Sequence, residues 1–568
     1  MKPAHYFFCF FTLFASYTNA LAQNNVLLPN KAIDKKLAPG EHHPYTVSLK
    51  TGEYFTATVM QKGVDVAIDV IDPQGKKLGT FDSPNGDQGP EPITIEAQSA
   101  GNYQLDIYNF VDPATANDSS SIASTQKSGD YTISAITILS AEANKQRLAQ
   151  VQKDKDLFRQ WLQQNAHDLK TVDAENGFED LQPYKNILKN VQVVGLGESS
   201  HGTSEFFRMK HRMLEFLVKE MGYTAFYIEA SRKRCEYINR YVLYGEGTLD
   251  TATAIQGFTT WRVYEVRSMI DWMRKYNATV PLSKRVKFLG YDIQINDVGQ
   301  QQLNAFYKQV APEKLPHLDS LWALLDSAAR LSNSTLNPGS GQRPYQSAFN
   351  QSLEILQDIS LNNGTYQYAT GKEIYNQNLL NIKLIIEEII SYKDGYNGQR
   401  DYYMAQNILE LLNLEPPGSK VVVWAHNIHI AKTLDDGISS MGGYLAQTLK
   451  QKYYTIGFEF YEGSFQSRNL DSNNRTPDWD IITIGAPPVE SLAWYFNKAG
   501  KEKCYVDFKD ASAVNIKNRS LAYPMHGFGS MYSSKRKETN LVSLAGFDGL
   551  IYIKHSTAAK KFTKVYAR

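Results

Sequence analysis

The chain has 568 residues, more than one hydrophobic core usually serves, so we expect at least two domains and an interior large enough for a buried site. Hydrophobic residues at 42% and aromatic residues at 12% exclude a largely disordered chain. The formal net charge of +1 provides no general attraction for nucleic acid or an anionic membrane, so we expect small neutral or mixed-charge ligands and no nucleic-acid partner.

Residues 1–22 have the pattern of a signal peptide. Lys2 begins a short basic region, residues 6–15 are apolar, and Ala20-Leu21-Ala22 is a small-residue cleavage site before Gln23. The apolar stretch is too short for a membrane span, and no later stretch reaches about 18 uncharged apolar residues. We therefore expect export, periplasmic or secreted, with no membrane insertion after cleavage. An unremoved N-terminal anchor is the alternative.

Three cysteines bear on the compartment. Cys9 lies in the signal segment and is lost with it. Cys235 and Cys504 remain and could form one disulfide in an oxidising compartment, but two cysteines cannot form a cysteine-based metal site.

The region 23–140 is typical of an all-β domain. Short apolar runs are separated by Gly, Pro and Asn signals, as between the strands of a sandwich. The runs are Tyr45–Leu49, Tyr54–Met60, Val64–Ile71, Ile93–Glu96, Tyr103–Tyr108 and Tyr131–Thr137. In Gln61–Asp65, Asp72–Gly75 and Gly101–Tyr103 the pattern resembles the pre-peptidase C-terminal module of exported bacterial enzymes. No catalytic cluster falls within it, so we interpret it as an accessory β-sandwich.

The region 141–568 predicts an α/β catalytic domain. A charged helical segment from Ala141 to about Leu169 leads into it, and strand-like runs then alternate with long amphipathic helices. This order predicts a parallel sheet covered by helices. A helical insertion follows at about 299–413, with apolar residues at the spacing of core packing. Its tyrosines Tyr345, Tyr366, Tyr368 and Tyr375 could instead line a lid over the strand ends.

Polar residues follow five of the predicted strands at the same end. The strands and the residues after them are Gln192–Gly197 with Glu198 and His201, Ala225–Ile228 with Glu229, Val286–Gly290 with Asp292, Val421–Ala425 with His426 and His429, and Tyr454–Phe458 with Glu459. In open parallel sheets the ligand lies beyond the carboxyl ends of the strands. We therefore expect these histidines and carboxylates to converge. His526 could also reach the cleft on a loop, but a lone histidine is more often structural.

His201 has the best surroundings for a general base. A helix is predicted from about Glu205 to Met221, with Thr203 or Ser204 as its N-cap. The positive end of that helix favours the neutral imidazole, and Glu198 or Glu229 could fix its tautomer. A base that activates water requires this arrangement.

Several motifs together resemble the erythromycin esterase family. They are the run Gly197-Glu198-Ser199-Ser200-His201-Gly202-Thr203-Ser204-Glu205-Phe206, Glu229, Gly257-Phe258 with Trp261 and Glu265, Gly290–Gln294, and Trp424–His429. The resemblance covers about Asn190 to Ser556. It implies hydrolysis of an ester or lactone by a metal-independent route in which His201 activates water.

The resemblance also implies roles for the other polar residues of the cleft. Orienting or transition-state-stabilising groups are Glu198, Glu229, His426 and His429. Substrate-binding groups are Lys210, Asp292, Trp261 and Glu265. Resistance esterases can have an arginine where this chain has Lys210, and the two cations differ in geometry. Macrolide specificity, and with it a role in antibiotic resistance, therefore stays open.

Two motif-based alternatives fit poorly. Gly195-Leu196-Gly197 imitates a dinucleotide-binding fingerprint, but the third glycine is missing and Glu198 would oppose a pyrophosphate. A serine nucleophile at Ser199 lacks the glycine two residues later that a nucleophile elbow needs.

Two broader alternatives remain. His201, His426, His429 and a carboxylate match the ligand types of zinc or manganese, although no H-E-x-x-H pair supports them. We expect no cofactor, with a metal-dependent hydrolase as the alternative. The second alternative is a non-catalytic surface-binding protein of the same fold, because fold alone does not specify function.

Overall fold

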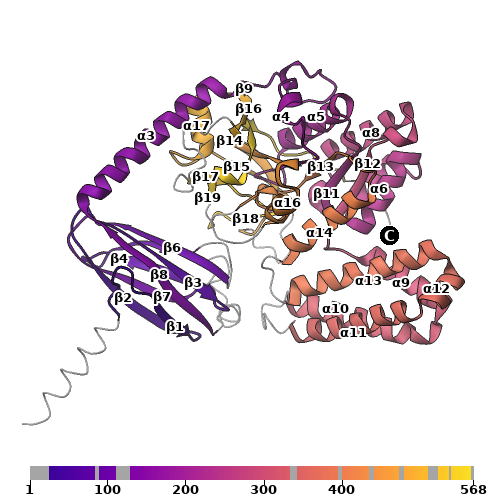
Figure 1. Cartoon of the computed structure of the whole chain (residues 1–568), viewed down its shortest axis with the longest axis horizontal. Coiled ribbons are helices and arrows are strands. Elements are labelled where there is room, and N and C mark those ends of the chain that lie inside the picture. The colour runs from indigo at the N-terminus through magenta and orange to yellow at the C-terminus, as the bar shows by residue number, and fades with distance from the viewer. Residues whose placement is uncertain are drawn as a thin grey trace, which may run out of the picture. The chain divides into compact units, whose positions relative to one another are not determined.

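The computed structural model describes residues 25–82, 88–110, 128–332, 342–393, 399–433, 440–471, 479–509, 522–535 and 539–563 (Figure 1). The predicted signal peptide lies outside these residues. The chain divides into two compact units, Met1–Gln152 and Lys153–Arg568, and the boundary falls inside helix α3 (Ala141–Asn165).

The first unit is a sandwich of two antiparallel sheets, which confirms the predicted all-β domain. Its sheets have the strand orders β1-β8-β3-β6 and β2-β7-β4-β5. The strands are β1 (Ile33–Leu37), β2 (His42–Leu49), β3 (Tyr54–Lys62), β4 (Val66–Ile71), β5 (Lys77–Phe81), β6 (Gln88–Glu96), β7 (Gly101–Asn109) and β8 (Gly129–Leu139). Alternate residues such as Phe55, Ala57 and Val59 are buried between the sheets, as the period of a half-buried strand requires.

The second unit is built on a mixed sheet with a parallel centre. In the described residues the strand order is β12-β11-β13-β10-β14-β20-β16-β9, and each neighbouring pair from β12 to β20 is parallel. β16 and β9 are antiparallel at one edge, and β15 and β18 pair with the extension of β14. The strands are β9 (His167–Asp168), β10 (Val193–Leu196), β11 (Ala225–Ser231), β12 (Lys287–Asp292), β13 (Val421–Trp424), β14 (Tyr453–Asn469), β15 (Trp479–Ile484), β16 (Lys503–Asp507), β18 (Met531–Tyr532) and β20 (Gly549–Ser556). A separate pair is formed by β17 (Ala522–His526) and β19 (Thr539–Ser543). The predicted α/β class is confirmed.

Helices lie between the strands of the second unit. They are α4 (Tyr184–Ile187), α5 (Ser204–Met221), α6 (Arg232–Tyr244), α7 (Leu249–Ala254), α8 (Tyr264–Thr279), α15 (Asn427–Ile430), α16 (Met441–Leu449) and α17 (Leu492–Lys498). Helix α5 begins after Thr203, as predicted, and ends at Gly222, whose φ of 72° is the left-handed conformation that glycine adopts without strain.

A helical insertion lies between β12 and β13. Its helices are α9 (Asp297–Val310), α10 (Leu315–Ser332), α11 (Gln342–Leu361), α12 (Asn363–Thr370), α13 (Lys372–Lys393) and α14 (Gln399–Leu414). Figure 1 shows α9 to α13 gathered together, and they enclose a hydrophobic core of their own. Tyr345, Tyr366 and Tyr375 belong to this core, whereas Tyr368 is exposed. The first three tyrosines therefore pack inside the insertion, not on a lid.

The two remaining cysteines do not form the disulfide that an oxidising compartment would allow. Cys235 on α6 and Cys504 on β16 are buried free thiols, and burial raises the pKa of both. None of the helices in the described residues is both long and apolar enough to cross a membrane.

Candidate active site

Residues from three neighbouring strands meet at the carboxyl edge of the sheet. β13 lies between β10 and β11, and its last residue Trp424 pairs with Leu196 and with Ile228. The residues that follow these strands are therefore adjacent. The ring centroids of His201 and His426 are 5.0 Å apart, and the backbone N–H of His426 donates to Oε2 of Glu229 at 3.1 Å.

Glu198 joins His201 to a buried cation. Its Oε1 accepts from Nδ1 of His201 at 2.6 Å. Its Oε2 accepts from Nζ of Lys210 at 2.6 Å and from Nε1 of Trp424 at 2.9 Å. A carboxylate bonded to Nδ1 holds a neutral imidazole in the tautomer whose Nε2 can accept a proton. Of the two carboxylates considered from the sequence, Glu198 is the one that bonds to His201.

Lys210 lies behind Glu198. Its side chain is fully buried, and its ammonium group lies 4.2 Å from the centre of the Trp424 ring. Burial lowers the pKa of Lys210 to about 8, even though the negative charge of Glu198 opposes that shift. These contacts make Lys210 a partner of Glu198, whereas the resemblance implied a substrate-binding group.

The loop that carries His201 packs tightly against other backbone. Phe528 donates its N–H to the carbonyl of Ser199 at 2.7 Å, and Gln466 and Ala559 donate theirs to the carbonyl of Gly202 at 3.0 and 2.8 Å. A Cβ added at Gly202 would lie only 2.0 Å from the carbonyl oxygen of Gln466. This position therefore needs glycine for a close backbone approach.

Gly202→Ala is expected to lower the free energy of unfolding by about 1–3 kcal/mol, because the strand or the loop must shift to admit the methyl group. Thermal denaturation followed by circular dichroism measures it. The matched control is Gly529→Ala, where an added Cβ would meet none of the described atoms within 4 Å. Equal midpoints for the two variants would contradict the packing argument.

Asn427 joins the ends of the central strands. Its backbone N–H donates to the carbonyl of Glu198 at 2.8 Å. Its side-chain amide accepts from the N–H of Phe458 at 3.0 Å and donates to the carbonyl of the same residue at 2.8 Å. A Cβ at Gly197 would lie 2.1 Å from Oδ1 of Asn427. The amide therefore occupies the space that a side chain at Gly197 would need.

His426 is a neutral hydrogen-bond donor. Burial, reinforced by the neighbouring histidines, lowers its pKa well below the ordinary value. Its Nδ1 accepts from the N–H of Ile428 at 3.3 Å, so the proton of the neutral ring is on Nε2. That Nε2 is buried and has no hydrogen-bond partner among the described residues. A buried donor without a partner beside His201 is suited to bind developing negative charge.

A second group of charges surrounds Arg400. Its Nη2 donates to Glu229 Oε1 at 2.8 Å and to Asp292 Oδ2 at 2.6 Å, and its Nε donates to Asp292 Oδ1 at 3.1 Å. Its Nη1 lies 3.2 Å from Nε2 of His429, whose Nδ1 is 2.8 Å from Asp401. Sequence reasoning missed Arg400 and Asp401, because they open helix α14 and do not follow a strand. Their only signal in the sequence is a charged pair in a helical segment.

Comparisons with known proteins agree on one family. Residues 218–556, more than half of the chain, match the erythromycin esterase family. The chain belongs to the erythromycin esterase family. It is 26% identical over 431 residues to erythromycin esterase type II of Escherichia coli, covering 71% of this chain and 99% of that protein. It is 23% identical to the putative hydrolase YbfO of Bacillus subtilis (strain 168), covering 72% and 93%. The chain is accordingly a hydrolase of this family.

Solved structures show the same fold. A Bacillus cereus protein matches with a TM-score of 0.60 and 23% identity, covering 72% of this chain and 99% of that one. A mutant of the erythromycin esterase EreC in its open conformation matches with a TM-score of 0.53 and 17% identity, covering 68% and 96%.

Trp261 and Glu265, which the sequence analysis assigned to substrate binding, both bond to other groups of the protein in this erythromycin esterase fold. Nε1 of Trp261 donates to the carbonyl of Glu229 at 2.9 Å, and its ring is edge-on to His201 with centroids 5.4 Å apart. Trp261 is therefore a wall of the cluster. Glu265 accepts from Ser204 Oγ at 2.6 Å and from the N–H of Lys560 at 3.1 Å. Its contacts tie helices to the C-terminal segment, and the structure does not bring it to the histidines.

His526 and Glu459 form a separate pair. Nδ1 of His526 lies 2.7 Å from Oε1 of Glu459, and both side chains are buried. The His526 ring stacks on Phe460 and Phe528. These contacts fix the His526 ring, whose Nε2, like that of His426, has no hydrogen-bond partner among the described residues.

The metal alternative can be compared with the donor geometry. In the parts of the chain that the structure describes, no group of three or more His, Cys, Asp or Glu is arranged to hold a metal ion. The carboxylates of Glu229 and Asp292 and the Nε2 of His429 face the guanidinium of Arg400. The guanidinium group of Arg400 therefore occupies the position between these three groups.

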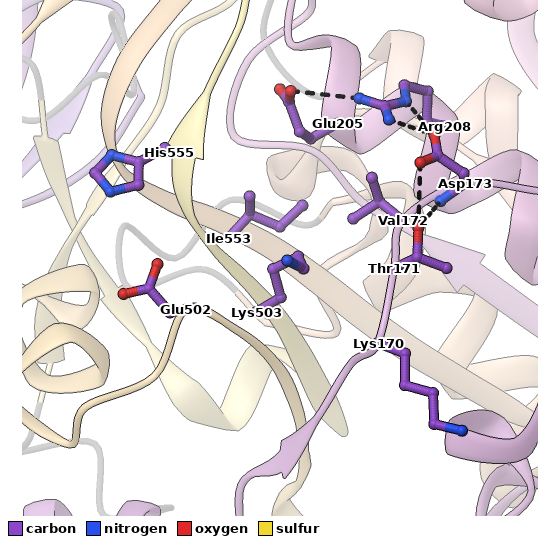
Figure 2. Close-up of a pocket in the computed structure, with 10 residues that line it drawn as sticks. All are labelled: Lys170, Thr171, Val172, Asp173, Glu205, Arg208, Glu502, Lys503, Ile553 and His555. Atoms are coloured by element: carbon purple, nitrogen blue, oxygen red, sulfur yellow. Dashed lines mark hydrogen bonds and ion pairs between the residues drawn. The ribbon is translucent and has the colours of Figure 1, made fainter.

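A surface pocket of about 270 Å³ lies elsewhere on the second unit (Figure 2). It is lined by Lys170, Thr171, Val172, Asp173, Glu205, Arg208, Glu502, Lys503, Ile553 and His555, none of which belongs to the histidine cluster. Figure 2 shows Arg208 paired with Asp173 and Glu205 on one side of it. Charges of both signs line this pocket, so they indicate no particular class of ligand.

Proposed function

We propose that this protein is an exported hydrolase that cleaves a carboxylic ester or lactone of a small molecule, with His201 activating water. The observation that carries the proposal is the pairing of two differently prepared histidines. His201 has Nδ1 bonded to Glu198, and the neutral His426 beside it has an unpartnered Nε2–H among the described residues.

The chemistry follows from these two rings. Nε2 of His201 takes a proton from water as the oxygen attacks the ester carbonyl, and Glu198 stabilises the imidazolium that forms. The carbonyl oxygen becomes an oxyanion, and Nε2–H of His426 donates to it. When the intermediate collapses, His201 returns the proton to the leaving alkoxide. Water supplies the hydroxyl of the acid product, so no covalent enzyme intermediate is needed.

Lys210 and Trp424 support this cycle. They donate to the Oε2 of Glu198 that faces away from His201, so the carboxylate keeps its orientation throughout the proton transfers. The erythromycin esterase relatives support an ester or lactone substrate, and the pattern of residues 1–22 supports export. We assign an accessory role to the β-sandwich.

The test is hydrolysis of a panel of p-nitrophenyl esters and lactones, erythromycin included, by the purified full chain with and without EDTA. We expect turnover that EDTA does not lower, with less than stoichiometric protein-bound zinc or manganese. Activity lost on chelation and restored by added metal would replace the mechanism with a metal-dependent one. No turnover of any ester or lactone would favour a binding protein with the same fold.

A further inference from the structure

Arg400 contacts several ionisable side chains of the site, and no motif in the sequence predicted these contacts. Its guanidinium reaches two carboxylates on different strands, Glu229 on β11 and Asp292 on β12, and one histidine, His429 on α15. Its side chain is 11% exposed, so these contacts are made largely out of water. The residue itself belongs to the first turn of α14, the last helix of the insertion.

The two carboxylates need a shared cation. Glu229 and Asp292 are both buried, and two negative charges that bond to the same nitrogen of Arg400 would repel each other without that cation. Burial alone would raise the pKa of Glu229, but His429, Arg400 and His201 hold it well below the ordinary value. Nη2 of Arg400 bonds to both carboxylates, and the fork adds a second bond from Nε to Asp292 and places Nη1 beside His429.

Glu229 transmits this order to His426. Its Oε1 is held by Arg400 at 2.8 Å, and its Oε2 accepts the backbone N–H of His426 at 3.1 Å. The proposed oxyanion donor is thus anchored through Glu229 to Arg400.

His429 has two mutually exclusive arrangements at Nε2. As a neutral ring with its proton on Nδ1 toward Asp401, it accepts from Arg400 Nη1 at 3.2 Å. As a cation it would donate from Nε2 to Glu229 Oε1, 3.4 Å away, beside the like charge of Arg400. Burial lowers the pKa of His429, but Asp401 and Glu229 outweigh burial and raise it, while Arg400 opposes them. The neighbouring ring that also faces it, His426, is neutral.

We propose that Arg400 is a positioning residue of the hydrolytic site: it orders Glu229 and, through it, His426, and its guanidinium beside Nε2 of His429 opposes protonation of that nitrogen. The helical insertion thereby supplies part of the active site. This inference rests on the proposed function for its kinetic consequences. Its effect on His429 does not depend on any substrate.

The experiment compares Arg400→Ala and Arg400→Lys with Arg234→Ala in the full chain. Arg234 is a matched control, because it is 13% exposed and makes the same two-pronged contact, at 2.9 and 2.7 Å, with Asp297 of the insertion. Hydrolysis of p-nitrophenyl acetate gives kcat and KM, with and without millimolar guanidinium ion. Carbon-13 NMR of labelled histidine, with the His429 signal assigned from His429→Gln, follows the titration of that ring without turnover.

For Arg400→Ala we expect kcat to fall about 10²-fold with little change in KM, and guanidinium ion to restore part of it. Arg400→Lys keeps the charge without the fork and should lose about tenfold in kcat. Removal of the like charge should move the His429 titration to higher pH, since Arg400 disfavours the imidazolium. Arg234→Ala should keep the kinetics and the His429 titration of the wild type.

The inference is overturned if Arg400→Lys has wild-type kcat, or if the His429 titration is the same in the wild type and in Arg400→Ala. An equal loss of activity in Arg234→Ala, unaffected by guanidinium ion, would reduce Arg400 to a structural contact. If the wild type hydrolyses no ester, the proposed function fails, while the NMR titration still decides whether Arg400 controls His429.

Discussion

Replacement of His201 by glutamine is expected to lower kcat for a p-nitrophenyl ester by at least about 10²-fold, the lower end of what general-base catalysis contributes. Glutamine can still donate to Glu198, but its amide does not accept a proton at neutral pH. The thermal midpoint should change little, because the ring is partly exposed and Glu198 keeps its bonds to Lys210 and Trp424. Steady-state kinetics and thermal denaturation of the same preparation measure both quantities.

Ser199→Ala is the control for a covalent route. Its hydroxyl is buried without a hydrogen-bond partner among the described residues, so its loss should leave kcat almost unchanged. Intact-protein mass spectrometry during turnover should show no acyl adduct. Full activity in His201→Gln, or an acyl group on Ser199, would refute water activation and reopen the serine alternative.

Lys210→Met is expected to destabilise the protein by about 3–5 kcal/mol, the range found when one member of a buried ion pair is removed. Methionine keeps much of the volume, but Glu198 would remain at a fully buried position without its cation. Chemical denaturation of the full chain measures the free energy of unfolding, provided that the two units are followed separately.

The same helix provides the control. Lys219, also on α5, pairs with Glu215 but is 40% exposed, so Lys219→Met should cost no more than about 1 kcal/mol. Combining Lys210→Met with Glu198→Gln removes both charges and should recover much of the lost stability. If Lys210→Met is no more destabilising than Lys219→Met, then Lys210 is not needed to stabilise the buried carboxylate of Glu198.

The central sheet could be predicted because its strands are buried on both faces and read as continuous apolar runs. The run at 421–425 became β13 (Val421–Trp424), and the polar residues after β10, β11 and β13 do converge. Strands β9, β15, β16, β17, β18 and β19 of the second unit were missed, as were β1 and β5 of the sandwich. β1 has three exposed charged residues, and β5 has no fully buried residue, so neither shows a strong apolar pattern.

The hydrogen-bond and ion-pair partners of the predicted site residues could not be predicted from apolar runs and strand ends. Lys210 resembles any helical lysine in the sequence, and only the packing of α5 against the sheet places it under Glu198. Glu265 matches a motif of the family and was therefore assigned to substrate binding, but it bonds to Ser204 and Lys560. Arg400 reaches the site through tertiary contacts of the helical insertion. The spacing of apolar residues in that insertion predicts only its hydrophobic core.

The contact between Gly197 and Asn427 has a consequence for anyone who alters the specificity of this enzyme. Because the amide of Asn427 fills the place of a side chain at Gly197 and also completes the pairing of Phe458, neither position can vary alone. A mutant library that randomises the cleft one position at a time would discard almost every change at these two positions. Randomising Gly197 and Asn427 together samples the combinations that a library built one position at a time would lose.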